Sequence, residues 1–162
     1  MLRDAHALAR TALGEDHPDV GAIATNLGFW LTQEGRHDEA LTLLDRALEI
    51  RKAAFGDAHP QVASTLSIKA NLLLATEDYS AARDAARQAR VILAENLSAD
   101  HWRVATAASA EGAALTELGD YAGAEALLVR SKEILSQGGA AMELLSRQSS
   151  ERLEHLYSVW RK

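Results

Sequence analysis

The fold is decided by residues 14–20, whose sequence is Gly-Glu-Asp-His-Pro-Asp-Val. The pattern returns as Gly-Asp-Ala-His-Pro-Gln-Val at 56–62 and, less closely, as Ser-Ala-Asp-His-Trp-Arg-Val at 98–104. Each copy begins 42 residues after the one before it. A fixed period of this length is the signature of a solenoid or another repeat array. The repeat therefore organises this chain before any single helix is assigned.

Two further segments keep the same phase. Gly-Arg-His-Asp-Glu-Ala at 35–40 aligns with 77–82 and 119–124, and Ala-Leu-Glu-Ile at 47–50 aligns with 89–92 and 131–134. Pro18 suits the first turn of a helix, and Gly35 suits the left-handed residue that ends one. Each period therefore predicts two amphipathic helices joined by a short turn, an A helix followed by a B helix. We predict an all-α chain.

The spacing of small and large residues in each period resembles the tetratricopeptide repeat. The residues that carry the resemblance in the first period are Asn26, Leu27, Gly28, Gly35, His37, Ala40, Leu44 and Ala47. The Gly-x-x-His-Pro link is similar to that of the longer 42-residue form, found in kinesin light chains and in many bacterial signalling proteins. The resemblance implies a right-handed α–α superhelix of antiparallel helix pairs. HEAT repeats are an alternative of similar period, but they lack the Gly-Asp-Tyr-x-x-Ala turn present at 119–124.

The phase of the repeat also predicts internal boundaries in a single solenoid of residues 1–162. They are a partial B helix of an upstream repeat at 1–16, repeats at 17–58, 59–100 and 101–137, and a capping helix or truncated fourth repeat at 138–162. A half, three whole repeats and a further half suggest a piece of a longer solenoid or an excised domain. We state this as a hypothesis.

Composition excludes several classes of function. The 162 residues contain no cysteine, which excludes disulfide scaffolds, thiolate metal sites and cysteine nucleophiles. The formal net charge of −6 gives no overall attraction to nucleic acid or to an anionic membrane. The sequence shows neither a signal peptide nor an apolar stretch long enough to span a bilayer. We therefore predict a cytoplasmic protein that binds neither membrane nor nucleic acid.

The histidines do not indicate a metal or catalytic site. His17, His59 and His101 recur at the repeat period in the link before each A helix, so we expect them to cap or pack that link. Glu151 and His155 lie one helical turn apart, but two potential ligands without a third make a weak metal site. Neither a Gly-x-Ser-x-Gly elbow nor a Gly-rich phosphate loop is present. We predict no enzymatic activity, no cofactor and no metal.

The resemblance implies that a ligand peptide binds in a concave groove lined by the A helices. Carried over by position, the groove residues are Thr25, Phe29, Thr32, Gln33, Ser67, Asn71, Leu74, Ser109, Ala113 and Thr116. Family members that clamp a terminal carboxylate use lysine, arginine and asparagine at these positions, and only Asn71 remains here. We therefore do not expect a carboxylate clamp, and we predict a leucine-rich or mixed polar and apolar segment as the ligand.

Charged and aromatic residues outside the groove give three more predictions. Arg83, Arg87 and Arg90 form a basic strip on a B helix; it could dock an acidic partner or RNA, but a solvated face paired with neighbours such as Asp84 is the simpler interpretation. Lys69 and Glu111 occupy the position of Leu27 in adjacent repeats, which predicts a partly buried lateral ion pair. Trp30 aligns with Leu72 and Ala114, so we expect it to pack against the preceding B helix.

Two functions are compatible with this pattern. The first is a non-enzymatic module that binds a peptide or protein partner through the concave face. The second is a structural or regulatory segment of a larger bacterial signalling protein, such as a kinase or caspase-like peptidase, that packs on another domain of the same chain or self-associates. The out-of-phase ends favour the second somewhat, because a half-repeat should expose an apolar face.

Overall fold

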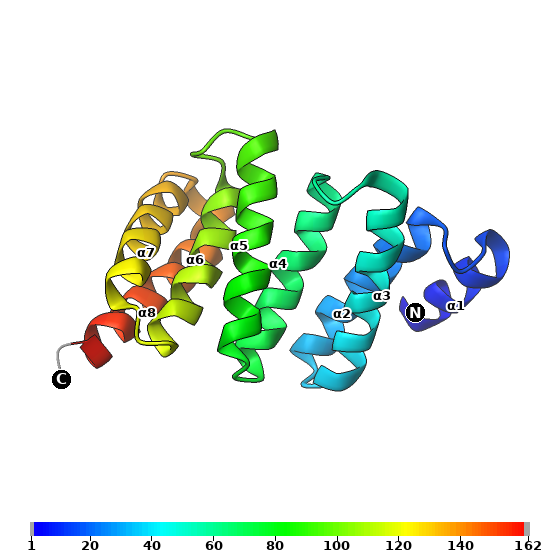
Figure 1. Cartoon of the computed structure of the whole chain (residues 1–162), viewed down its shortest axis with the longest axis horizontal. Coiled ribbons are helices and arrows are strands. Elements are labelled where there is room, and N and C mark those ends of the chain that lie inside the picture. Colours follow the sequence, from blue (N-terminus) through cyan, green and yellow to red (C-terminus); the bar gives the residue numbers. More distant parts are fainter. Residues whose placement is uncertain (1, 161–162) are drawn as a thin grey trace.

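The computed structural model describes residues 2–160, which form eight α-helices and one short 3-10 helix (Figure 1). The helices are α1 (Leu2–Leu13), α2 (Pro18–Gln33), α3 (His37–Phe55), α4 (Pro60–Ala75), α5 (Tyr79–Asn96), α6 (Trp102–Glu117), α7 (Tyr121–Ser136), η1 (Gly139–Met142) and α8 (Glu143–Trp160). No strand occurs among these residues. The predicted all-α solenoid of antiparallel helix pairs is confirmed.

The helices stack in two rows. The A helices are α2, α4, α6 and α8, and the B helices are α1, α3, α5 and α7. Within the described residues, neighbouring A helices pack on one another, whereas neighbouring B helices do not. The stack therefore curves, with the A helices on its inner, concave side and the B helices on its outer, convex side. Extended concave surfaces of this kind are characteristic of solenoids.

In each of the three whole repeats, the A helix meets its own B helix through a matched pair of residues. A Cβ atom built on Gly28 would lie 2.8 Å from Leu44, and one built on Gly112 would lie 2.7 Å from Leu128. The second repeat has alanine at both equivalent positions, Ala70 and Ala86, and both are fully buried. A large side chain on one helix thus faces a residue without a side chain on the other, and two small residues face each other in the middle repeat.

The links between repeats are capped as predicted. His17, His59 and His101 are the N-caps of α2, α4 and α6, and the Nδ1 atom of each accepts a hydrogen bond from the backbone N–H two residues later, at 3.1–3.2 Å. Each cap satisfies one of the amides that a helix leaves without an internal partner. The His59 ring also stacks on Phe55, with the ring centres 4.6 Å apart. These histidines therefore have a structural role in the repeat.

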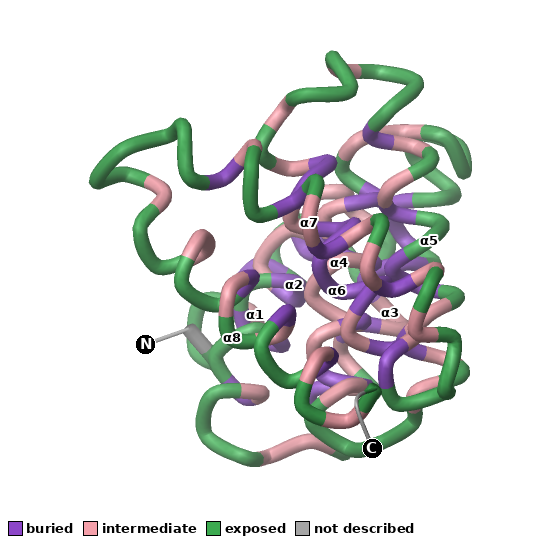
Figure 2. The backbone as a smooth tube through the Cα atoms, turned by 90° about the vertical axis from the view of Figure 1, so that its left-hand side faces the viewer, coloured by how far each residue is buried: buried purple, intermediate pink, exposed green. Residues whose placement is uncertain are grey.

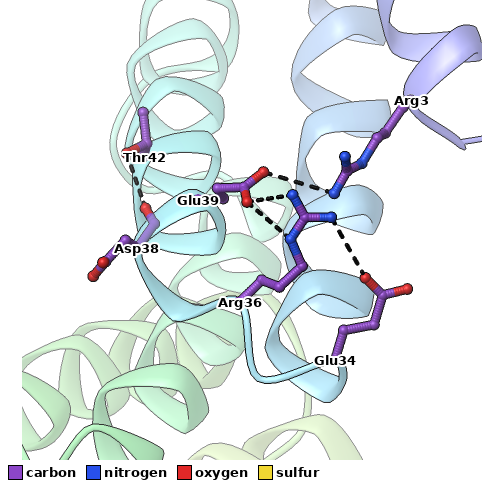
Figure 3. Close-up of polar contacts among 6 residues, drawn as sticks. All are labelled: Arg3, Glu34, Arg36, Asp38, Glu39 and Thr42. Carbon is purple, nitrogen blue, oxygen red and sulfur yellow. Dashed lines mark hydrogen bonds and ion pairs between the residues drawn. The ribbon is translucent and has the colours of Figure 1, made fainter.

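The turn inside the first repeat differs from the other two. Asp78 and Asp120 cap α5 and α7 through their side chains, but the residue at this place before α3 is Arg36, which makes no side-chain cap. Figure 3 shows that Arg36 instead pairs with Glu39 in the first turn of α3. Arg3 of α1 also reaches Glu39, with 3.6 Å between Nη2 and Oε2. This cluster connects α1 to the start of α3.

The core has no single centre. Figure 2 shows the buried residues gathered in the middle of the molecule and the turns exposed at its edge. The buried apolar side chains form successive clusters along the solenoid: one around Ala9, Val20 and Ile50, and another around Leu128, Leu153 and Leu156 at the opposite end. A core of this shape needs few large aromatic residues. Among the described helices, none combines the length and the apolar character needed to cross a membrane.

Candidate partner-binding groove

The predicted groove residues lie on three A helices, but they differ in exposure. Thr25, Ser109 and Thr116 are buried, whereas Phe29 and Gln33 are exposed. The remaining five, which are half-buried, are Thr32, Ser67, Asn71, Leu74 and Ala113. The structure brings part of this set together in one cavity and leaves the rest outside it.

The concave cavity has a volume of about 400 Å³ and lies between α4, α6 and α8. Three predicted groove residues line it, namely Leu74, Ala113 and Thr116. Its other lining residues are Tyr79, Glu117, Gln148, Glu151, Arg152 and His155. The last four belong to α8, which therefore forms one wall of the cavity.

Arg152 is the functional candidate that the sequence did not reveal. Its Nη2 atom donates to Asn71 Oδ1 at 2.8 Å, and its Nη1 atom donates to Ser109 Oγ at 3.1 Å. The guanidinium of α8 thus reaches across α6 to α4. Burial lowers the pKa of Arg152 to about 10, so the side chain remains protonated at neutral pH. Extending the 42-residue phase into α8 aligns Arg152 with the half-buried Ile68, which is the signal that could have identified it.

A hydrogen bond closes one edge of the cavity. His155 Nε2 lies 2.7 Å from Glu117 Oε1, which connects α8 to the end of α6. Glu151 lines the cavity one helical turn away and lies 3.7 Å from Arg147. Glu151 and His155, which the sequence suggested as a weak metal pair, therefore face the groove. Within residues 2–160, three or more His, Asp or Glu side chains do not cluster in a way that could hold a metal ion.

The hydroxyl and amide groups of the predicted groove are largely occupied within their own helices. Thr32, Ser67 and Thr116 donate to the carbonyl four residues earlier, at 2.8–3.0 Å. Asn71 Nδ2 donates in the same way to Ser67 O at 2.9 Å, which leaves its Oδ1 atom for Arg152. The polar chemistry offered by this surface is therefore that of Arg152 and the α8 side chains more than that of the small hydroxyls.

Thr25 is part of the junction between the first two repeats. Its Oγ1 atom lies 3.1 Å from Thr65 Oγ1, and Arg51 Nη1 donates to the same Thr65 hydroxyl at 2.8 Å. Arg51 also donates to the carbonyl of Gln61, and its Nε atom has no partner among the described residues. Burial lowers the pKa of Arg51. Thr25 thus contacts the next A helix from inside the stack, so a ligand in the groove would not reach it.

Comparison with known proteins agrees with this geometry. Residues 19–95 match the tetratricopeptide repeat family. The expected resemblance to tetratricopeptide repeats is confirmed over these residues. No curated protein is a significant relative of the sequence.

Solved tetratricopeptide-repeat structures share the fold at low sequence identity. A Podosopora anserina protein described as a kinesin light chain with nearly identical TPR-like repeats has a TM-score of 0.76, with 20% identity over 97% of this chain and 74% of that chain. A single-residue variant of the same protein has a TM-score of 0.78 with the same identity and coverage. BtubC (BKLC) from P. vanneervenii has a TM-score of 0.74 and 23% identity, over 86% of this chain and 56% of its own. The predicted resemblance to kinesin light chain-type repeats is confirmed.

The predicted ion pair between Lys69 and Glu111 of neighbouring repeats is wrong. Lys69 pairs with Asp45, and Glu111 pairs with Arg90, whose Nε atom lies 2.6 Å from Glu111 Oε2. Both charges on the A helices therefore pair with the B helix that precedes them in the stack. A B helix lies between successive A helices along the chain, and its side chains are the nearer partners. Lys69 and Glu111 are not paired with each other in the described part of the chain.

The basic strip on α5 is divided among different contacts. Arg83 pairs with Asp84, as the simpler interpretation of the sequence predicts, and Arg90 is engaged with Glu111. Arg87 is exposed and has no ion pair among the described residues. The three arginines therefore do not form one continuous unpaired strip.

Trp30 does not pack as expected. Its side chain is 54% exposed, whereas the equivalent residues of the later repeats, Leu72 and Ala114, are buried beneath the preceding B helix. Before α2 that place belongs to α1, which leaves most of Trp30 uncovered. Phe29 meets Trp30 edge to face, with the ring centres 5.8 Å apart. Together they form an exposed aromatic patch at the first repeat.

Proposed function

We propose that this chain is a non-enzymatic protein-interaction module, and that a segment of a partner protein binds in the concave cavity between α4, α6 and α8. Tetratricopeptide repeats typically act as scaffolds of this kind, through extended inner surfaces. The observation that carries the proposal is Arg152, a cation held beside the cavity by two uncharged side chains. A cytoplasmic setting is part of the proposal.

The surroundings of Arg152 indicate what the partner segment contains. A guanidinium has five N–H donors, and the bonds to Asn71 and Ser109 leave donors for an acceptor on the ligand. Leu74 and Tyr79 supply apolar contacts in the same cavity. Glu151 and Glu117 would oppose a strongly acidic ligand. This combination favours a mixed segment that offers one carbonyl or carboxylate oxygen to Arg152 and an apolar side chain to Leu74.

Replacing Arg152 by glutamine tests this proposal. Peptides are first selected on the wild-type protein from a displayed library of random sequences, and their affinities are then measured by fluorescence anisotropy. We expect Arg152→Gln to weaken binding by about tenfold or more, because the charge-assisted hydrogen bond to the ligand is lost. Arg83→Ala, on the convex face, is the matched control and should leave the affinity unchanged.

Circular dichroism of Arg152→Gln must show that α8 remains folded, since this side chain also connects α8 to Asn71 and Ser109. Selected peptides that bind the folded variant as tightly as the wild type would place the interaction surface elsewhere. Arg152→Lys keeps the charge and loses the planar geometry, so an intermediate affinity is expected.

A second function is favoured by the patch of Phe29 and Trp30. These side chains are 42% and 54% exposed and lie side by side, which suits packing on another domain of a larger signalling protein or on a second copy. Sedimentation over a wide concentration range distinguishes packing on a second copy from packing on another domain. If the patch mediates self-association, the wild type dimerises as its concentration rises and the Phe29→Ser/Trp30→Ser variant stays monomeric. A wild type that is monomeric throughout would exclude self-association.

A further inference from the structure

The convex face of the solenoid carries a repeated ion pair that closes the gap between successive B helices. Arg46 of α3 pairs with Asp16 in the link that follows α1, and it also bonds to Glu49 at 2.9 Å. Two repeats later, Arg130 of α7 pairs with Asp100 in the link after α5 and with Glu133 at 3.3 Å. We call each Arg–Asp pair, with its Glu three residues after the arginine, a strap. One strap crosses the first of the three junctions between B helices, and the other crosses the third.

The middle junction, between α3 and α5, lacks the strap. The residues at the three equivalent positions are Ala58, Gln88 and Val91, so the aspartate, the arginine and the glutamate are all replaced. A cavity of about 450 Å³ opens at this place. Its floor consists of Val62 and Leu66 of α4, and Val91 and Ile92 line its α5 side. At this junction the three charged residues are thus replaced by uncharged ones that line an aliphatic groove, whereas the hollow on α7 at the equivalent positions is lined by Arg130 and Glu133 of the strap.

Charged side chains surround this groove unevenly. Lys52 is paired with Asp57, with 3.1 Å between Nζ and Oδ1. Arg87 lines the groove as well and, among the described residues, has no ion pair. The equivalents of Arg87 in the other repeats are Asp45 and Val129, so a cation at this position is confined to the one junction without a strap. The groove thus combines an aliphatic floor with a cation that no carboxylate within residues 2–160 neutralises.

The shape of the groove indicates the kind of ligand. Among its lining residues only Val62 and Leu66 are buried, and most of the others are exposed, so the site is shallow and open to solvent. Small-molecule sites usually enclose most of their ligand, within about 300–1,000 Å³. A shallow groove of this volume would leave a free small molecule largely in water, whereas the rest of a protein partner can rest on the surrounding surface of α3 and α5.

We propose that the groove between α3 and α5 is a second docking site, which receives a protein segment with an aliphatic side chain and an adjacent aspartate or glutamate. The aliphatic side chain contacts Leu66 and Ile92, and the carboxylate pairs with Arg87. The charge of Arg87 selects an acidic neighbour, and the aliphatic floor selects leucine, isoleucine or valine. This site lies on the opposite face of the molecule from the concave cavity and does not depend on it.

The test restores the missing strap. The variant A58D/Q88R/V91E recreates at the middle junction the residues present at the other two, so it should close the groove without disturbing the fold. Peptides are selected on the wild type from a displayed library of random sequences, with removal of those that also bind this variant. We expect the remaining peptides to carry an aliphatic residue next to an acidic one. Their affinity for the strapped variant, measured by fluorescence anisotropy, should fall at least tenfold.

Three further variants make the test specific. Arg87→Glu reverses the charge without filling the groove and should also weaken these peptides at least tenfold, while Arg152→Gln should leave them unaffected. Conversely, D100A/R130Q removes the strap of the third junction and should have no effect, because Val129 supplies no cation there. Failure of this proposal and failure of the concave site are therefore distinguishable.

Three outcomes would overturn the proposal. The first is that no peptide survives the removal step, and the second is that the survivors lack an acidic residue or bind Arg87→Glu as well as the wild type. The third is a wild-type dimer, seen by sedimentation, that disappears in the strapped variant, because the groove would then receive a second copy of this chain. The melting temperature of the strapped variant must be at least that of the wild type, which shows that lost binding is not lost folding.

Discussion

Replacing Gly112 by alanine is expected to lower the free energy of unfolding by about 1–3 kcal/mol, the usual range for overpacking a buried contact. A Cβ at this position would lie 2.7 Å from the Cγ and 3.0 Å from the Cδ2 of Leu128. Leu128 is fully buried, so it cannot move into solvent to relieve the overlap. The backbones of α6 and α7 must separate instead. Urea denaturation followed by circular dichroism measures the change.

A double-mutant cycle shows whether this contact is the cause. Leu128→Ala alone should destabilise by about 2–5 kcal/mol, because it leaves a cavity. In G112A/L128A the two changes recreate the alanine pair of the middle repeat, Ala70 and Ala86. The free energy of unfolding lost in the double variant should therefore be smaller than the sum of the losses in the two single variants. Additive losses would contradict the argument. Gly28 and Leu44 offer the same cycle in the first repeat, with a 2.8 Å approach.

Replacing Arg90 by alanine is expected to destabilise the protein by about 3–5 kcal/mol, since it removes the partner of a buried carboxylate. The Glu111 side chain is only 8% exposed, and Arg90 holds it with Nε 2.6 Å from Oε2. An uncompensated charge at this depth cannot be hydrated without opening the contact between α5 and α6. Thermal unfolding and urea denaturation of the variant give the size of the loss.

The other repeats indicate a second substitution that should restore the stability of this variant. Leucine occupies the position of Glu111 both in α2, as Leu27, and in α8, as Leu153, and both are buried. Adding Glu111→Leu to Arg90→Ala should therefore recover most of the stability. Lys69 and Asp45 are the matched control, because Asp45 is 48% exposed and an exposed pair contributes less than about 1 kcal/mol. A loss in Lys69→Ala equal to that in Arg90→Ala would show that burial is not the reason.

The repeat period predicted the helices and the histidine caps, because each follows from local spacing, and the resemblance to tetratricopeptide repeats implied the inner position of the A helices. It could not predict contacts that depend on the curvature of the stack. Arg152 reaches Asn71 across an intervening helix, and 81 residues separate the two in the sequence. Similarly, alignment shows that Lys69 and Glu111 are equivalent, but equivalence of position does not reveal which neighbouring side chain is nearer.

The exposed residues were hard to predict for a related reason. Repeat alignment assigns Trp30 the burial of Leu72, although burial depends on whether a preceding helix covers the position. The convex groove was visible only as three substitutions, at Ala58, Gln88 and Val91, and their common effect appears once the straps of the neighbouring junctions are seen. Local spacing therefore predicts the helices and caps that recur in every repeat. The contacts that distinguish one junction from another are visible only in the structure.

The matched residues of each helix pair also determine where such a chain can be recombined with itself. A crossover in the link at 56–59 moves a whole repeat and keeps Gly28 with Leu44. A crossover in the turn at 34–36 that joined α2 to α5 would leave Gly28 opposite Ala86, which creates a void. In the reverse exchange Ala70 would face a leucine. Duplication of an intact helix pair is therefore the kind of recombination that preserves this fold.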